Sequence, residues 1–288
     1  MREFFLFNKD IKLNIITHNI NNPNCILIHL HGIGSNFQYD TLTNNDFDNR
    51  INFFKKLNIL SYGLEFRGHG KSDGKSCYIQ NFDELVEDFM TIYRYVKCIY
   101  SSKKIFVIAE SMGGCVILKS CLKYNLKLDG VILLAPLCGV NDELLPSQNI
   151  INLVLKISYY FPSYKMIGTH KMNEGCCNPK YNLLKTLNKY AYKGKFRLST
   201  SRECYLSSRW VFENKEKFNL PILAIHSMTD KVTCYKKTKS FIDHSSSVDK
   251  ELFLLEDGHH TLLVPLFNKD YQPIIILSKI INWINNRL

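Results

Sequence analysis

A serine follows an apolar run and has small residues two positions before and after it. The run Phe106–Ala109 continues into Glu110–Gly114, which contains Ser111. This order predicts a strand, a sharp turn and a helix, in which a strained backbone holds the serine hydroxyl above the sheet edge. Side chains larger than Ala109 and Gly113 would collide where strand and helix come close. The usual pattern is G-x-S-x-G, so this is a variant of the nucleophile elbow, and an ordinary serine N-cap is the alternative.

A serine nucleophile needs a base, and the base needs an acid that orients it. Both residue types follow later apolar strands. Asp230 comes soon after Pro221–His226, and His259 and His260 come soon after Glu251–Leu255. Loops at the carboxyl ends of parallel strands meet at one edge of a sheet, so these side chains are expected to converge on the serine. Each taken alone also fits a turn or a surface loop, but the chain order Ser, Asp, His is that of the α/β-hydrolases.

Acyl transfer also needs backbone N–H donors for the oxyanion that forms on the substrate. One candidate is the N–H of Met112, the residue after the serine. The other lies in the loop after the apolar run Cys25–Leu30, where the sequence His31–Ser35 contains two glycines. The N–H of Ile33 is the candidate there, because the glycines let this loop approach a substrate closely.

The elements that must position these loops alternate between strand and helix. A hairpin of two strands is predicted at Glu3–Phe7 and Lys12–Thr17, and further strands at Cys25–Leu30, Ile59–Phe66, Ile105–Ala109, Val131–Ala135, Pro221–His226 and Glu251–Leu255. Helices are predicted at Phe47–Leu57, after Ser111, at Tyr271–Leu288, and from Asn81 to Tyr100 with Asn81 and Glu84 as a capping box. The alternation predicts an α/β fold with a mostly parallel, doubly wound sheet.

The alternation of strands and helices stops between Gly139 and Lys217, where no strong strand is predicted. An apolar and aromatic helix is predicted there at Ile150–Tyr160. We therefore expect an α/β-hydrolase core formed by residues 1–138 and 218–288. Residues 139–217 are expected to form a helical cap, or lid, inserted over the strand ends. The helix at Ile150–Tyr160 either packs on the core or contacts an acyl chain and a membrane surface.

The composition excludes several other classes. The chain has 288 residues, 45% of them hydrophobic, and a net charge of +11. Its lysines are scattered and no nucleic-acid-binding signature is present, so no nucleic-acid partner is expected. The positive charge reflects either a compositional bias of the chain or a weak attraction to anionic lipid surfaces. Ten cysteines without zinc spacing indicate free thiols in a reducing compartment. Without a signal peptide or a bilayer-spanning stretch, a cytoplasmic protein is expected, with peripheral membrane contact through the cap.

Together, these residues resemble the monoglyceride lipase and lysophospholipase branch of the serine α/β-hydrolases, with the plant-type members nearest. The resemblance rests on six blocks that cover almost the whole chain in order, namely His31–Ser35, Phe66–Gly74, Tyr78–Asp83, Glu110–Gly114, Leu134–Cys138 and Gly258–Leu262. It implies hydrolysis of acyl esters without a cofactor. It also implies a mobile cap whose apolar face admits a fatty acyl chain.

The resemblance also bears on individual residues. The family base follows a glycine-containing turn and an aromatic residue, which implies that His260 is the base and that His259 takes the place of the aromatic; a Gly-His pairing would instead favour His259. Animal monoglyceride lipases carry an acidic residue where this chain has Ser35 and a polar residue near Leu263. Those groups help to hold the glycerol head, so glycerol recognition stays open.

The sequence therefore predicts a serine hydrolase that cleaves a lipid ester, a monoacylglycerol or a lysophospholipid. Ser111 is the predicted nucleophile, His260 the base and Asp230 the orienting acid, with the N–H groups of Ile33 and Met112 as the oxyanion hole. No metal or other cofactor is expected. The alternatives are an esterase for a small non-lipid ester and a non-catalytic binding module on the same fold.

Overall fold

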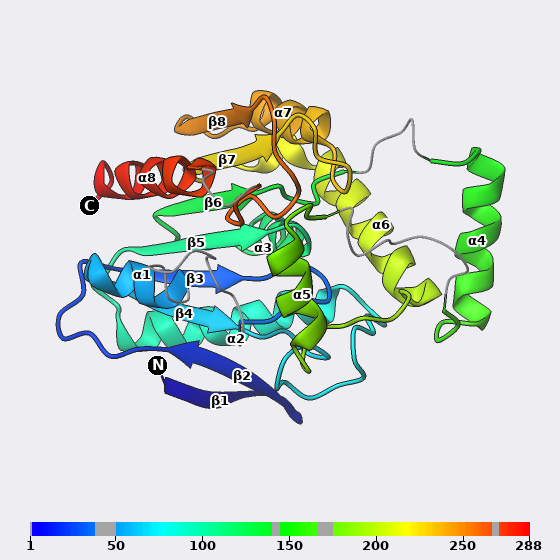
Figure 1. The fold of residues 1–288 in the computed structure, drawn as a ribbon, viewed down its shortest axis with the longest axis horizontal. Helices are drawn as coiled ribbons and strands as arrows, with labels where there is room; N and C mark the ends of the chain where they lie inside the picture. Colours follow the sequence, from blue (N-terminus) through cyan, green and yellow to red (C-terminus); the bar gives the residue numbers. More distant parts are fainter. Residues whose placement is uncertain (1, 38–49, 140–144, 166–174, 267–270) are drawn as a thin grey trace.

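A single sheet organises the computed structural model of the chain, which describes residues 2–37, 50–139, 145–165, 175–266 and 271–288 (Figure 1). The described strands are β1 (Arg2–Asn8), β2 (Ile11–Thr17), β3 (Cys25–Leu30), β4 (Ile59–Leu64), β5 (Ile105–Glu110), β6 (Gly130–Leu134), β7 (Ile222–Ser227) and β8 (Lys250–Leu255). They lie in the order β1-β2-β4-β3-β5-β6-β7-β8. Strand β1 pairs antiparallel with β2, and β2 pairs antiparallel with β4. The strands from β3 to β8 all run parallel to one another. The predicted strands and their mostly parallel arrangement are confirmed.

Helices cover both faces of the sheet (Figure 1). They are α1 (Arg50–Lys56), α2 (Asp83–Ile99), α3 (Met112–Lys123), α4 (Gln148–Tyr160), α5 (Pro179–Leu187), α6 (Leu198–Glu213), α7 (Tyr235–His244), α8 (Gln272–Asn285) and the 3-10 turn Lys215–Lys217. Alternate strand residues point to opposite faces, so Ile28 packs in one core cluster with side chains of α2, α3 and α7, and Leu27 in another with those of α1 and α8. Both faces of the central strands are therefore buried.

Two helix starts differ from the sequence-based expectation. The capping box at Asn81 and Glu84 does not form. Phe82 is the N-cap of α2 and has no side-chain capping bond, while the Asn81 side chain accepts a hydrogen bond from the N–H of Asp83 at 2.9 Å. The Glu84 carboxylate instead forms an ion pair with Arg67, with 3.2 Å between Glu84 Oε1 and Arg67 Nη1. The helix expected from Phe47 is described from Arg50 onward, and its earlier residues lie outside the described ranges.

The chain between β6 and β7 holds α4, α5 and α6. Helices α5 and α6 lie near the carboxyl ends of the parallel strands, and α4 lies beyond α6, at the far side from the sheet (Figure 1). The described residues of this segment add no strand to the sheet, only an isolated bridge between Lys165 and Arg197. We call the helices α4 to α6 and their connections the inserted segment.

All ten cysteines lie within the described residues and are free thiols. Most are buried, and burial raises the pKa of several of them, for example of Cys77 and Cys138 to about 12. Of the helices in the described ranges, none has both the length and the apolar character required to cross a bilayer.

Candidate active site

Ser111 lies at the turn between β5 and α3, with φ at +48° and ψ at −115°. A positive φ is strained for a residue with a side chain, so the surrounding structure must hold it. The Ser111 N–H donates to Leu134 O at 3.1 Å, and the Ser111 carbonyl accepts from the N–H groups of Cys115 and Leu137 at 3.3 and 2.9 Å. The Ser111 side chain makes no capping bond to α3, which is unlike an ordinary serine N-cap.

Small residues around Ser111 allow strand and helix to come close. A Cβ on Gly113 would lie 2.7 Å from Leu30 O and 2.9 Å from His31 O, which is closer than real Cβ atoms come to backbone oxygens. Ala109 is fully buried in the sheet. A Cβ on Gly32 would lie 3.3 Å from the Cβ of Ser111, so the loop after β3 passes directly beside the serine.

Asp230 and His260 form a hydrogen-bonded pair. His260 Nδ1 donates to Asp230 Oδ2 at 2.8 Å. The same oxygen contacts His226 Nε2 at 3.1 Å and the Thr233 hydroxyl at 3.0 Å, while Oδ1 accepts from the N–H groups of Val232 and Thr233 at 2.7 and 3.1 Å. Burial tends to raise the pKa of this carboxyl, but the hydrogen bonds from His226 and His260 hold it well below its usual range. Asp230 is therefore an ionised, fully bonded carboxylate behind His260.

His226 was not singled out by sequence reasoning. It lies near the end of β7 and is fully buried. An ionised carboxylate only accepts hydrogen bonds, so His226 Nε2 must carry the proton in its contact with Asp230. His226 Nδ1 is then an acceptor, and it accepts a hydrogen bond from the Thr238 hydroxyl at 2.8 Å. A histidine in an otherwise apolar, buried strand four residues before Asp230 was the available signal.

The two adjacent histidines have different surroundings. The His260 ring faces the cavity beside Ser111 and holds Asp230 through Nδ1, which leaves Nε2 as the unprotonated nitrogen of the neutral ring. His259 is buried, with Nδ1 2.9 Å from the Thr261 hydroxyl and Nε2 3.5 Å from the sulfur of Cys176. The structure thus places His260 next to Asp230 and turns His259 toward other partners.

The loop after β3 is held by a histidine. His31 Nε2 accepts the N–H of Phe66 at 3.2 Å, so Nδ1 carries the proton and donates to Gly32 O at 2.8 Å. This bond orients the peptide that precedes Ile33, and Ile33 lines the same cavity as Ser111. Met112 is the first residue of α3, where N–H groups have no acceptor within the helix. The two residues whose N–H groups are predicted for the oxyanion hole, Ile33 and Met112, therefore lie in the loop and the helix that adjoin Ser111.

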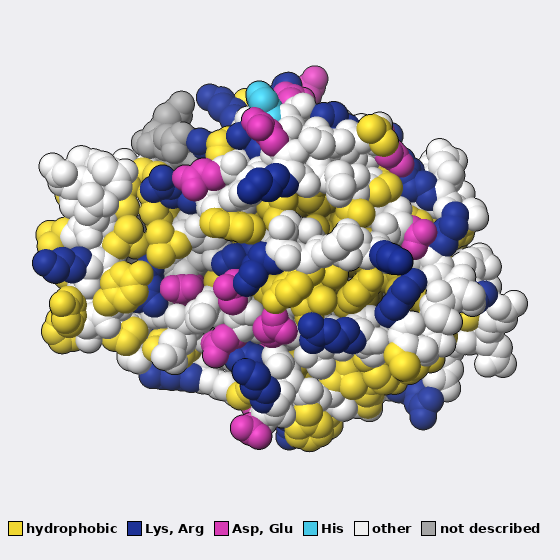
Figure 2. Space-filling model, turned by 180° about the vertical axis from the view of Figure 1, so that it is seen from behind, with side chains coloured by type: hydrophobic (Ala, Val, Ile, Leu, Met, Phe, Trp, Pro, Cys, Tyr) yellow, Lys and Arg dark blue, Asp and Glu magenta, His cyan; other side chains and the backbone are white. Residues whose placement is uncertain are grey.

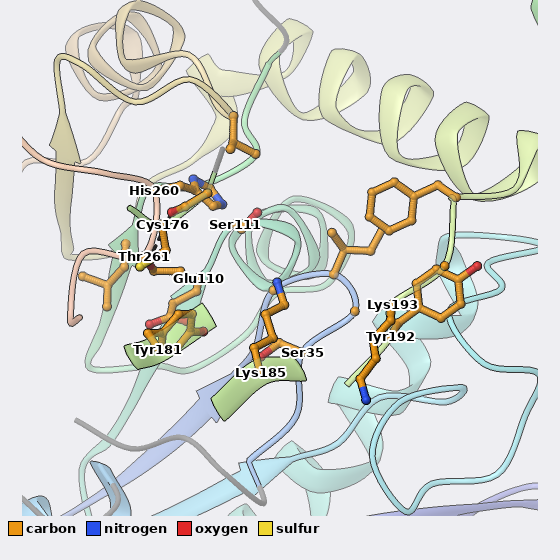
Figure 3. Close-up of a pocket in the computed structure, with 18 of the residues that line it drawn as sticks. Ser35, Glu110, Ser111, Cys176, Tyr181, Lys185, Tyr192, Lys193, His260 and Thr261 are labelled. Atoms are coloured by element: carbon orange, nitrogen blue, oxygen red, sulfur yellow. Dashed lines mark hydrogen bonds between the residues drawn. The ribbon is translucent and has the colours of Figure 1, made fainter. Parts of the chain in front are cut away.

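A cavity of about 370 Å³ opens at Ser111. Figure 3 shows Ser111 and His260 at one side of it, with residues of α5 and of the chain that follows α5 across from them. Its lining includes Gly32, Ile33, Ser35, Glu110, Leu134, Cys176, Tyr181, Lys185, Tyr192, Phe196, Val232 and Thr261. Leu263 instead packs in the core with α8, so that position does not face the cavity. Within the described ranges, no three His, Cys, Asp or Glu side chains are grouped as a metal site would require.

Comparisons with known proteins agree on one family and fold. A family profile described as serine aminopeptidase, S33, matches residues 22–265. Caffeoylshikimate esterase of Arabidopsis thaliana is 26% identical over 82% of this chain and 71% of that protein. Monoglyceride lipase of Rattus norvegicus is 21% identical over 92% of this chain and 84% of that protein. A monoglyceride lipase structure from Saccharomyces cerevisiae, solved with a substrate analogue, superimposes with a TM-score of 0.79 at 14% identity, over 99% of this chain and 94% of that one.

Proposed function

The chain belongs to the serine aminopeptidase S33 family and is an ester hydrolase of its monoglyceride lipase-like branch with the α/β-hydrolase fold, and on that premise we propose a reaction and a substrate class. The reaction is acyl transfer to Ser111, with His260 as the base and Asp230 as the acid that orients it. The substrate is a carboxylic ester of a lipid, a monoacylglycerol or a lysophospholipid. The inserted segment is the cap that admits it.

In the proposed mechanism, His260 Nε2 takes the hydroxyl proton as Ser111 Oγ attacks the ester carbonyl carbon. The resulting oxyanion is stabilised by the N–H groups of Ile33 and Met112. His260 then gives the proton to the departing alkoxide, and the carbon–oxygen bond breaks to leave an acyl-enzyme. A water molecule repeats both steps and releases the fatty acid. Asp230 fixes the ring tautomer and stabilises the imidazolium that forms twice per cycle.

The observation that carries this proposal is the 2.8 Å bond between His260 Nδ1 and Asp230 Oδ2, at a cavity that Ser111 also lines. The bond dictates which nitrogen of His260 is the base. The strained φ of Ser111 adds a second argument, because such strain is typically kept where it serves a function.

Lipid esters are favoured over small esters by the surface of the inserted segment. Helix α4 exposes Ile150, Leu153, Val154 and Ile157, each between 39% and 57%, and contains no carboxylate. Figure 2 shows hydrophobic side chains gathered at the left edge of the molecule, where α4 lies in that view. An exposed apolar face is one feature of the amphipathic helices that lie at a membrane surface. We propose that α4 makes peripheral membrane contact, from which the cap receives its substrate.

A small phenolic ester is the second candidate, because a matched relative is named caffeoylshikimate esterase. The aromatic rings of Tyr192 and Phe196 line the cavity and would pack against a phenolic acyl group. The dependence of kcat/KM on acyl length separates the two candidates. A preference for short aryl esters over lauroyl or oleoyl glycerol would overturn the lipid assignment.

The proposed function is tested with Ser111→Ala and, as a matched control, Ser102→Ala at an exposed serine. Loss of the nucleophile is expected to reduce kcat on a panel of monoacylglycerols and lysophospholipids by on the order of 10⁶-fold. A fluorophosphonate probe is expected to label the wild type and the control but not Ser111→Ala. Unlabelled wild-type protein would instead support a non-catalytic binding module, and activity retained by Ser111→Ala would exclude this serine as the nucleophile.

A further inference from the structure

The cavity beside Ser111 has an excess of positive charge. Among the described residues its lining contains three lysines, Lys185, Lys193 and Lys195, and one carboxylate, Glu110. Figure 3 shows the amine of Lys185 directed into the open part of the cavity toward Ser111, whereas the nitrogen of Lys193 is directed away. Of these two lysines, Lys185 is therefore the one that would meet a substrate bound at Ser111.

The position of Lys185 is set by the fold. It lies in the last turn of α5, and this helix is hydrogen-bonded near both ends to neighbouring loops. Before its first turn, Asn178 Nδ2 donates to Pro265 O at 2.8 Å, close along the chain to His260. After its last turn, Asn188 Nδ2 donates to Asn36 Oδ1 at 3.3 Å, just past the loop after β3 that contains Ile33. The helix that carries Lys185 is thus tied to both loops of the site.

Lys185 is half-buried and has no carboxylate partner among the described residues. Burial lowers the pKa of its ammonium group, and the neighbouring thiols of Cys176 and Cys77 offset this effect only in part. A cation that is partly dehydrated without a counter-ion is costly for the fold. Groups of this kind concentrate at functional sites, where a ligand supplies the missing charge.

We propose that Lys185 binds an anionic group of the substrate, so that the preferred ester carries a phosphate or a carboxylate close to the scissile bond. This inference rests on the proposed ester hydrolysis at Ser111. It narrows the substrate class from lipid esters in general to anionic ones, and it favours phosphate-bearing lysolipids over neutral monoacylglycerols. An ammonium group donates up to three hydrogen bonds and pairs with either anion as a compact charge.

The test compares three substrates with one acyl chain and one three-carbon backbone. They are 1-lauroyl-glycerol, which is neutral, 1-lauroyl-glycerol 3-phosphate, and the 3-lauroyl ester of glyceric acid, each used below its aggregation concentration. The proteins are the wild type, Lys185→Met, Lys185→Arg, and Lys180→Met as the matched control. Lys180 is an exposed lysine of the same helix, so its loss removes the same charge outside the cavity.

Lys185→Met is expected to lower kcat/KM on the preferred anionic ester by about 10- to 100-fold, mainly through KM, because a charge-assisted hydrogen bond is lost. The kcat/KM of Lys185→Met for 1-lauroyl-glycerol should stay close to that of the wild type. For the anionic ester, Lys185→Arg should recover most of the lost kcat/KM, and Lys180→Met should have the same kcat/KM as the wild type. The anionic ester that suffers the larger loss identifies phosphate or carboxylate as the recognised group. A thermal melting temperature of Lys185→Met that is equal to or higher than that of the wild type will show that the loss of activity is local and not due to unfolding.

Equal losses on the neutral and anionic esters, or equal losses in Lys180→Met and Lys185→Met, would overturn the inference while leaving ester hydrolysis intact. No hydrolysis of these esters or of p-nitrophenyl butyrate by the wild type would instead overturn the proposed function, and this inference with it.

Discussion

Asp230 concentrates the polar contacts of the site on one buried carboxylate. Its two oxygens accept hydrogen bonds from backbone N–H groups, a threonine and two histidines. His226 binds Asp230 Oδ2 from the β7 side, and His260 binds the same oxygen from the loop after β8. Because His226 is fixed in turn by Thr238, the carboxylate has little freedom to rotate. The orientation of His260 is therefore set by contacts that lie away from the cavity.

Replacing Asp230 with asparagine tests the charge of this group. We expect kcat to fall by about 10⁴-fold, as when other triad acids become amides, because the amide no longer fixes the tautomer of His260. The lowered pKa of Asp230 means that its carboxylate stabilises the fold at every pH above its unfolded value of about 3.9 and loses this effect only as the pH falls further. The difference in free energy of unfolding between wild type and Asp230→Asn, measured with urea, should not narrow between pH 8 and pH 5. Narrowing within that range would contradict the lowered pKa.

His259 and His260 form a natural pair for testing the assignment of the base. His260→Gln is expected to lower kcat by about 10³-fold or more, because general acid and base catalysis is lost at both steps. His259→Gln removes the contacts with Thr261 and Cys176 but leaves the Asp230 pair in place, so most of the activity should remain. The kcat of both variants is measured from the steady-state hydrolysis of a soluble ester. The reverse ranking would make His259 the base.

Strand β3 and helix α3 are packed closely enough for glycine to be required between them. Helix α3 follows Ser111 directly, and Gly113 lies against the carbonyl oxygens that end β3. The strand that precedes Ile33 and the helix that begins at Met112, the two residues proposed to supply the oxyanion N–H groups, thus approach each other closely at Gly113. We expect this close approach to fix the distance between the two proposed donors.

Gly113→Ala is expected to separate α3 from β3. Alanine favours a helix over glycine by about 0.5–1 kcal/mol, but overpacking against rigid backbone costs about 1–3 kcal/mol, so the free energy of unfolding should fall. The kcat should fall as well, because Ser111 and Met112 move with the helix. Gly175→Ala is the stability control, since the nearest atom among the described residues that its new methyl group would meet is Val232 Cγ2 at 4.0 Å. Equal urea midpoints for the two variants would show that the close approach at Gly113 is not limiting.

The elements were predictable wherever one pattern dominated. Buried parallel strands read as continuous apolar runs, and residues such as Ser111 and Asp230 follow directly at their carboxyl ends. The capping box at Asn81 failed because Arg67, distant in sequence, competes for Glu84. His226 and Lys185 were not predictable as site residues, because their roles depend on how β7 and α5 lie against other parts of the chain. The residues that neighbour His226 and Lys185 in the sequence do not indicate such contacts.

The whole molecule is asymmetric in how it exposes apolar surface. The sheet and its covering helices bury their apolar faces, whereas α4 leaves most of its own exposed (Figures 1 and 2). Helix α4 is joined to α6 by Arg202, whose guanidinium donates to Ser158 O at 3.0 Å and lies 4.3 Å from the ring centre of Tyr159. The apolar surface therefore lies at the end of the molecule that carries the inserted segment. A lipid surface bound there would lie on the same side as the cavity.

Substituting Leu153 and Ile157 of α4 together by glutamine tests this arrangement. The change removes exposed apolar area that would enter the interfacial region of a bilayer, at about 25 cal/mol for each Å² buried. We expect weaker cosedimentation with phosphatidylcholine–phosphatidylglycerol vesicles and slower hydrolysis of long-chain monoacylglycerol in vesicles, with unchanged hydrolysis of p-nitrophenyl butyrate in solution. The control is the same double change at Phe7 and Val248, which are 65% and 100% exposed and lie outside the inserted segment. Because the control loses apolar surface without touching α4, an equal loss of vesicle binding in both variants would show that general hydrophobicity, and not α4, governs membrane contact.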